Sequence, residues 1–211
     1  MYTENPRLPL VAILRGLDPA EAPAIGAALF EAGFDILEVP LNRPGALEAI
    51  AILAKMAPPH ALVGGGTMLS CDHVHAVHAA GGRLMVAPNC DAEVIRCAED
   101  LDMFCAPGVA TPTEAFAAIA AGAHALKIFP AEMVGPHGLK AMKAVLPDGL
   151  PLWPVGGIKP ESMAEWIKAG ATGFGIGGAL YTPGVSVGEL AARARAFVDG
   201  WRAAQPGHAL R

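Results

Sequence analysis

The segment Ala-Leu-Lys-Ile-Phe-Pro-Ala-Glu, residues 125–132, places one lysine inside a run that is otherwise typical of a buried β-strand. Apolar residues flank the lysine, and Pro130 ends the run, as proline often does just beyond a strand. Because side chains alternate along a strand, Lys127 shares one face with Ala125 and Phe129, while the two residues beside it take the other face. The pattern therefore predicts a lysine on an interior face.

An interior lysine has two interpretations. Burying an ammonium group is costly unless it is paired or loses its proton, and a lysine with a lowered pKa is a nucleophilic amine. Alternatively, a lysine near a strand end extends its charged head to water and has no chemical role. The segment alone leaves both open for Lys127.

The same order of strand, loop and helix recurs along the chain. Short apolar runs are each followed by a loop signal and a longer alanine-rich stretch with helical spacing. The expected strands are 10–14, 35–39, 61–64, 84–87, 103–106, 125–129, 152–155 and 173–176. The expected helices are near 19–33, 45–57, 71–81, 91–101, 112–122, 137–146, 160–169 and 186–204.

These eight units predict an α/β fold with a parallel sheet closed into a (β/α)₈ TIM barrel, as one domain over residues 1–211. An open doubly wound sheet is the alternative. Its Gly-x-Gly-x-x-Gly turn is absent after the first strand, where Ile13-Leu14-Arg15-Gly16 stands instead.

Composition limits the classes of partner. The 211 residues carry a net charge of -5 and no basic block, which gives no electrostatic footprint for nucleic acid or an anionic membrane. No apolar run reaches membrane-spanning length, and the N-terminus lacks the layout of a secretory signal, so we expect a cytoplasmic protein. Partners are expected to be small molecules or copies of the chain.

The cysteines form no Cys-x-x-Cys pair and are expected to be free buried thiols: Cys71, Cys90, Cys97 and Cys105.

In a barrel of this kind the active site lies at the carboxyl ends of the strands. Glu38 alternates with Ile36 on the second expected strand, as Lys127 does with Ala125 on the sixth. Both charged side chains then point inward, and even-numbered strands fill the same layers of a barrel. A carboxylate beside a buried amine is suited to moving protons around a Schiff base, although a structural ion pair is the alternative.

Other strand ends bring groups suited to anions. Gly156, Gly157, Gly177 and Gly178 end the seventh and eighth strands, where barrels often bind phosphate with backbone N–H groups. Arg15 and Thr67 offer a charge and a hydroxyl for a substrate carboxylate, although a rim salt bridge would equally explain the arginine. Tight turns also use paired glycines, so each pair alone is weak evidence for a phosphate site. The two pairs at these two strand ends are stronger evidence together.

The cluster Asp72-His73-Val74-His75-Ala76-Val77-His78 invites a metal interpretation. His75 and His78 are neighbours on a helix, but His73 lies on another face, and this helix belongs to the outside of the barrel. A solvated or interface face is expected instead, and no ligand set occurs at the predicted mouth. We therefore expect no metal and no cofactor.

Six motifs keep an order and spacing that resemble a known family. They are Val-Ala-Ile-Leu-Arg-Gly (11–16), Leu-Glu-Val-Pro-Leu-Asn (37–42), Val-Gly-Gly-Gly-Thr (63–67), Ala-Pro-Asn (87–89), Leu-Lys-Ile-Phe-Pro-Ala-Glu (126–132) and Pro-Val-Gly-Gly-Ile (154–158). Together they resemble the pyruvate-forming aldolases acting on 2-keto-3-deoxy-6-phospho sugar acids, the KDPG and KDPGal aldolases.

The resemblance implies a class I aldolase barrel, assembled as a homotrimer, that binds a phosphorylated sugar acid and pyruvate. It implies Lys127 as the Schiff-base lysine and Glu38 as general acid/base. Further implied site residues bind the pyruvate portion, shape the pocket or receive the 6-phosphate: Arg15, Thr67, Pro88, Phe129, Gly156, Gly157, Gly177 and Gly178.

One motif departs from the gluconate branch of the family. That branch carries Thr-Leu-Arg where this chain has Pro40-Leu41-Asn42, and the Pro-Leu-Asn form resembles the galactonate branch. It implies 2-dehydro-3-deoxy-6-phosphogalactonate as substrate and Asn42 rather than Arg43 as a site residue. After the eighth strand this chain has Gly-Gly-Ala where many relatives carry a serine, so the resemblance implies Ala179 as a backbone donor to phosphate. The alternatives are a gluconate or dual-specificity aldolase, a phosphosugar-binding barrel without lyase activity, and a sugar-phosphate epimerase or isomerase.

Overall fold

The computed structural model describes residues 8–205, along which strands and helices alternate. The strands are β1 (Leu10–Ile13), β2 (Ile36–Pro40), β3 (Leu62–Gly66), β4 (Leu84–Val86), β5 (Phe104–Ala106), β6 (Gly108–Val109), β7 (Leu126–Ile128), β8 (Leu152–Pro154) and β9 (Phe174–Ile176). The α-helices are α1 (Ala22–Ala32), α2 (Ala46–Met56), α3 (Cys71–Ala79), α4 (Ala92–Glu99), α5 (Pro112–Ala120), α6 (Ala131–Lys143), α7 (Met163–Ala169) and α8 (Val187–Ala204), with a 3₁₀ turn at Pro160–Ser162. Within this described part, no helix is both long and apolar enough to cross a membrane.

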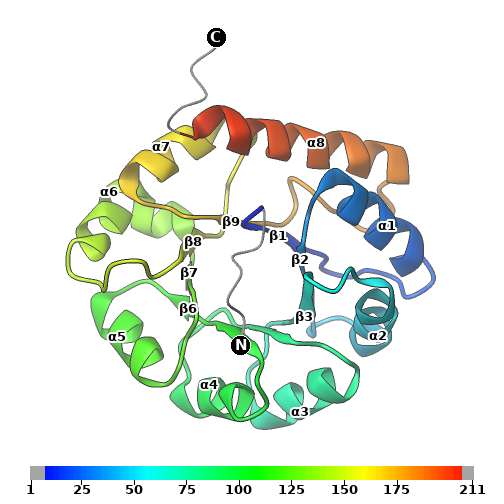
Figure 1. The fold of residues 1–211 in the computed structure, drawn as a ribbon, viewed down its shortest axis with the longest axis horizontal. Helices are drawn as coiled ribbons and strands as arrows, with labels where there is room; N and C mark the ends of the chain where they lie inside the picture. The colour runs from blue at the N-terminus through cyan, green and yellow to red at the C-terminus, as the bar shows by residue number, and fades with distance from the viewer. Residues whose placement is uncertain (1–7, 206–211) are drawn as a thin grey trace.

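The strands form two parallel sheets. The larger has the order β5-β4-β3-β2-β1-β9 and the smaller the order β6-β7-β8. Only Pro107 separates β5 from β6, and at the opposite side an isolated parallel bridge joins Val155, just after β8, to Gly175 of β9. Each edge of the small sheet thus lies next to an edge of the large one. Figure 1 shows the strands around a common centre and the helices outside them.

Two apolar layers follow from the alternation of side chains. The inner layer lies among the strands, and its buried members are Val11, Ile36, Leu62, Leu84, Val86, Ala106, Ala125 and Trp153. Leu126 and Ile128 instead join the larger cluster between strands and helices. The predicted division of this strand into two faces is confirmed for three side chains, because Ala125 faces inward while Leu126 and Ile128 face outward.

Side-chain caps begin three successive helices. Ser70 accepts the N–H of His73 at the start of α3, and Asp91 accepts two N–H groups at the start of α4. At α5, Thr111 and Glu114 form a reciprocal capping box. These side chains satisfy backbone donors that the helix itself leaves unpaired, so each helix starts at a defined residue just beyond a strand end.

All eight expected strands are present to within one or two residues at each end, but three expectations need correction. Strand β6 was not predicted, because two residues beside Pro107 carry no periodic signal. Helix α6 begins at Ala131 rather than 137, and Gly135 (φ 66°, ψ 166°) interrupts it. The Gly135-Pro136 pair resembles a helix start, since glycine adopts φ > 0 and proline suits a first turn. Helix α1 begins at Ala22 rather than 19.

Candidate active site

Two oppositely charged side chains meet inside the ring of strands. Glu38 on β2 and Lys127 on β7 are 1% and 7% exposed, and Lys127 Nζ lies 3.7 Å from Glu38 Oε1. Each takes the inward face of its strand, alongside Ile36 and Ala125 of the inner apolar layer. The structure therefore brings together the two residues that alternation had predicted to meet.

The third strand makes room for the carboxylate. A Cβ atom at Gly66 would lie 1.4 Å from Glu38 Oε2, so only glycine leaves space for the side chain in this position. At Gly64 a Cβ would lie 2.0 Å from the Leu84 carbonyl oxygen, so the absence of a side chain there allows β3 and β4 to approach closely. Within residues 8–205 Glu38 Oε2 has no hydrogen-bond partner. The triple glycine of β3 thus holds an unpaired carboxylate oxygen beside the amine.

Burial moves both groups toward their uncharged forms. Desolvation raises the pKa of Glu38 above its ordinary value, against the opposing effects of the positive charges on Lys127 and Arg15. Desolvation lowers the pKa of Lys127, and the nearby Arg15 lowers it further, while Glu38 acts in the opposite direction. A neutral amine and a carboxyl group that readily takes a proton are the forms required for attack on a carbonyl.

Several predicted residues lie beside this pair or directly after the strands that carry the site. Arg15 lies just after β1, and its Nη1 donates a hydrogen bond of 2.6 Å to Asn42 Oδ1. Lys127 Nζ lies over the Phe129 ring, 5.2 Å from its centroid. Thr67, directly after Gly66, has φ 54°, a left-handed conformation that costs a β-branched residue energy and is often found at functional sites.

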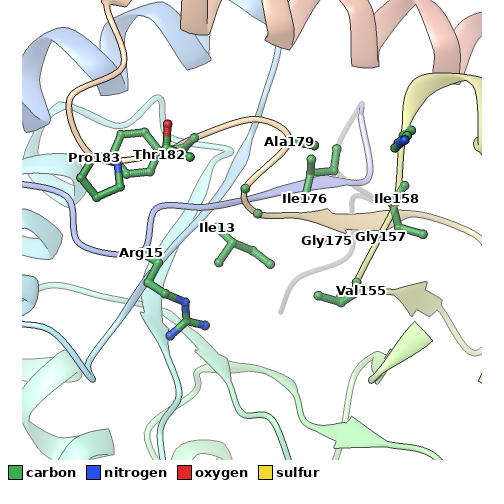
Figure 2. Close-up of a pocket in the computed structure, with 15 residues that line it drawn as sticks. Ile13, Arg15, Val155, Gly157, Ile158, Gly175, Ile176, Ala179, Thr182 and Pro183 are labelled. Carbon is green, nitrogen blue, oxygen red and sulfur yellow. The ribbon is translucent and has the colours of Figure 1, made fainter. Parts of the chain in front are cut away.

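A cavity of about 510 Å³ opens at the ends of β1, β8 and β9. Figure 2 shows Ile13, Arg15 and Val155 around this opening, with Gly157 and Ala179 on the loops beyond β8 and β9. The predicted residues that line it are Arg15, Gly156, Gly157, Gly177, Gly178 and Ala179. Gly156 (φ 119°) and Gly157 (φ 62°) both have left-handed backbone conformations. Much of the wall is therefore backbone without side chains.

The cavity does not contain every predicted residue. Glu38, Lys127, Asn42, Thr67, Pro88 and Phe129 are not part of its lining. Arg15 links the two regions, since it lines the cavity and its positive charge also lowers the pKa of both Glu38 and Lys127. Pro88 is half-buried after β4, and Arg43 is exposed outside the cavity.

Three further polar residues line the cavity without having been singled out from sequence: Lys159, Tyr181 and Thr182. Lys159 has a sequence signal, because a cation directly follows the Val-Gly-Gly-Ile motif. Tyr181 and Thr182 lie in a loop beyond β9 where no periodic pattern predicts direction. Burial raises the pKa of Tyr181 to about 12, so its hydroxyl stays protonated.

Among the described residues, one group gathers potential metal ligands, namely Glu99, Cys105 and His124. It lies at the amino ends of β5 and β7, away from the carboxyl ends that bear Lys127 and Glu38. His124 Nδ1 accepts the Cys105 backbone N–H at 3.1 Å, which leaves the ring proton on Nε2, 3.6 Å from Glu99 Oε2. The Nδ1 atom of His124 is therefore already engaged by the backbone. In the His-rich helix α3, His73 Nδ1 likewise accepts the Leu69 N–H.

Comparison with known proteins identifies the family. The family model described as "KDPG and KHG aldolase" matches residues 4–193. The chain belongs to this aldolase family.

Within the family, similarity differs between branches. The aldolase is 48% identical over 198 residues to 2-dehydro-3-deoxy-6-phosphogalactonate aldolase of Escherichia coli (strain K12), covering 94% of this chain and 97% of the relative. It is 33% identical over 162 residues to the 2-dehydro-3-deoxy-phosphogluconate aldolase of Zymomonas mobilis, covering 76% of each chain. A solved structure described as native KDPGal superposes with a TM-score of 0.93 at 47% identity, covering 95% of this chain and 98% of that one.

Proposed function

We propose that this protein is a class I aldolase that cleaves 2-dehydro-3-deoxy-6-phosphogalactonate to pyruvate and glyceraldehyde 3-phosphate. The observation that carries the proposal is the buried Lys127 Nζ at 3.7 Å from Glu38 Oε1. A lysine with a lowered pKa forms imines with ketones, and a carboxyl group with a raised pKa can donate a proton in one step and accept one in another.

In the first step the neutral amine of Lys127 attacks the C2 ketone and forms a carbinolamine. Glu38 in its protonated form donates a proton to the former ketone oxygen, which leaves as water. The product is an iminium ion between Lys127 and C2. The unpaired Oε2 of Glu38 is the oxygen free to carry this proton.

In the second step the iminium accepts the electron pair of the C3–C4 bond. The Glu38 carboxylate takes the proton of the C4 hydroxyl, the bond breaks, and glyceraldehyde 3-phosphate leaves. The remaining enamine takes a proton at C3, and water hydrolyses the imine to pyruvate and the free amine of Lys127. One carboxyl group thus serves as acid and base in turn.

Substrate binding is divided between side chains and backbone. Arg15, oriented by Asn42, is proposed to hold the pyruvate carboxylate together with the Thr67 hydroxyl. Pro88 and Phe129 are proposed to form walls beside the amine. The cavity at the ends of β8 and β9 is proposed to take the 6-phosphate through backbone N–H groups of Gly156, Gly157, Gly177, Gly178 and Ala179.

The choice of the galactonate branch is supported by the 48% identity to a galactonate-type relative against 33% to a gluconate-type one. The hydrogen bond that Arg15 donates to Asn42 gives the Pro-Leu-Asn motif a role beside the charged pair. Parallel rate measurements with both C4 epimers test this choice. A kcat/KM that favours the gluconate epimer would assign the enzyme to the other branch.

We further propose that the eight β-then-α units close into one (β/α)₈ barrel, with residues 1–211 forming a single domain. The direct passage from β5 to β6 through Pro107 supports counting these two as one interrupted strand. The parallel bridge from Val155 to Gly175 supports closure on the other side. A single cooperative unfolding transition is expected by calorimetry.

A homotrimer is proposed as the assembly. Large apolar side chains are exposed on the outer helices, among them Met133 on α6 at 81% and Phe116 on α5 at 48%. Figure 1 shows these two helices as neighbours on the rim. Light scattering coupled to gel filtration is expected to give a mass about three times that of the 21.6 kDa chain.

The proposed function is tested by incubation with pyruvate and borohydride, followed by peptide mapping. Reduction of the imine leaves a stable adduct, which is expected on Lys127. The Lys127→Arg variant is the matched control, because it keeps the positive charge but cannot form an imine. Folded protein that binds a phosphosugar without any adduct would instead be a non-lyase barrel, or an epimerase if it interconverts the C4 epimers.

A further inference from the structure

Two cysteines on neighbouring outer helices lie in direct contact. Cys71 is the first residue of α3, and Cys97 lies near the end of α4. The thiol of Cys97 lies against the backbone carbonyl group of Cys71. We propose that Cys71 and Cys97 are a reversible redox site, which forms a disulfide between α3 and α4 when the protein meets a small-molecule disulfide such as oxidised glutathione.

Backbone contacts fix how the two helices meet. Cys97 Sγ lies 4.0 Å from the Cys71 carbonyl oxygen, and Cys71 Sγ lies 3.9 Å from the Glu93 carbonyl oxygen. Glu93 is one helical turn before Cys97 on α4, so the Cys71 thiol rests on the turn that carries its partner. Each sulfur therefore already lies against the backbone of the other helix, which brings the two thiols to the same place on the surface.

The pair is open to a small oxidant. Both cysteines are partly exposed and line a surface hollow of about 380 Å³ together with His75 and Arg96. Cys105, by contrast, is buried, with its thiol 3.3 Å from the Met103 carbonyl oxygen. Cys90 is partly exposed but lies beyond the end of β4, and the hollow that holds the other two does not include it.

The exchange balances in two steps. One cysteine thiolate attacks the small-molecule disulfide, which forms a mixed disulfide and releases one thiolate equivalent. The second cysteine loses its proton and attacks the protein-side sulfur, which releases the other half of the oxidant as a second thiolate. Overall, two protein thiols are oxidised and one external disulfide is reduced to two thiols. Burial and the neighbouring Cys71 raise the pKa of Cys97 to about 11, so oxidation is expected to speed up as pH rises.

The bond would act on the active-site side of the fold. Cys71 follows Thr67 by four residues, so a link to α4 fastens the segment that leaves β3. Crosslinking distant positions removes conformations of the unfolded chain. The oxidised protein is therefore expected to unfold at a higher temperature than the reduced protein.

Mass spectrometry of the full chain tests the proposal. The protein is incubated with reduced and oxidised glutathione at fixed ratios, and the reaction is quenched with an alkylating agent. The mass of the intact protein is then measured. The expected product is about 2 Da lighter before alkylation and gives a linked peptide pair containing Cys71 and Cys97. Dithiothreitol is expected to restore the original mass and the lower Tm.

Matched variants separate this pair from the other thiols. Cys71→Ser and Cys97→Ser are each expected to abolish the link and the rise in Tm, whereas Cys90→Ser keeps both. Mixed glutathione adducts on Cys71 and Cys97 without a linked peptide would overturn the proposal, as would a link that involves Cys90. Circular dichroism of each reduced variant checks that the fold is retained.

Discussion

The two parts of the candidate site differ in what forms them, charged side chains in one and glycine backbone in the other. The charged centre consists of two long side chains, Lys127 and Glu38, that are almost wholly buried and lie 3.7 Å apart. The cavity at the ends of β8 and β9 is open, and glycines such as Gly157 and Gly178 form much of its wall. Side-chain chemistry is therefore concentrated in the first part and backbone recognition in the second. Substitutions in the centre should lower kcat, and those in the cavity should raise KM.

The largest effect is expected from Lys127→Ala. Loss of the amine removes the imine and every later step, so kcat/KM should fall by at least about 10⁴-fold. Stopped assays with the phosphorylated substrate measure the rate, and circular dichroism checks the fold. Cleavage within tenfold of the wild-type rate would show that another group is the nucleophile.

Glu38→Gln is expected to come next, with kcat lowered by about 10²- to 10⁴-fold. The amide occupies the same space but cannot exchange the proton. Because the Glu38 charge raises the pKa of Lys127, its removal should lower that pKa, and the pH profile of pyruvate trapping should shift to lower pH. An unchanged cleavage rate would contradict the acid/base role.

Gly178→Val addresses the cavity alone. A Cβ at Gly178 meets no atom within 4 Å, so the variant should fold, but its side chain would occupy space proposed for phosphate. We expect KM for the phosphorylated substrate to rise about tenfold while pyruvate trapping stays unchanged. Gly188→Val on α8, also with open space, is the matched control and should leave KM as it is.

Arg15→Gln tests the residue that belongs to both parts. The Arg15 charge lowers the pKa of Lys127, so its removal stabilises the ammonium form and raises that pKa. The pH profile of borohydride trapping should therefore shift to higher pH, opposite to the shift expected for Glu38→Gln. A shift in the same direction for both variants would show that charge does not control the amine.

The smallest effect is expected from Asn42→Ala. Arg15 loses its 2.6 Å hydrogen bond at an exposed position, and KM for pyruvate in the trapping reaction should rise about threefold. Arg43→Ala, one residue away and outside the cavity, serves as the control. Equal effects of the two substitutions would argue against a role for Asn42 in orienting Arg15.

Much of this arrangement follows from sequence periodicity. The alternation on either side of Lys127 and Glu38 predicts that both point inward, and repeated β-then-α units predict which strand ends share a mouth. The charged pair is predictable because it depends on which face of its strand each side chain takes, and two-residue periodicity reports that face directly. The structure brings the two atoms within 3.7 Å.

Other features depend on loops and on close approach, which periodicity does not report. The bond from Arg15 to Asn42 joins two loops 27 residues apart in sequence. The first turn of α6, before Gly135, is missed because the following Gly135-Pro136 pair resembles a helix start. Lys159 and Thr182 reach the cavity from turns whose direction is set by tertiary contacts.

The missing side chain of Gly66 has a consequence for any attempt to re-engineer this fold. Since a methyl group there would overlap the Glu38 carboxylate, the location of the acid is specified by the adjacent strand as much as by its own. A library that varies β2 alone can change which group is presented but not the volume it may occupy. Transplanting the acid to another scaffold would therefore require carrying over two strands together, one for the carboxylate and one for the empty space beside it.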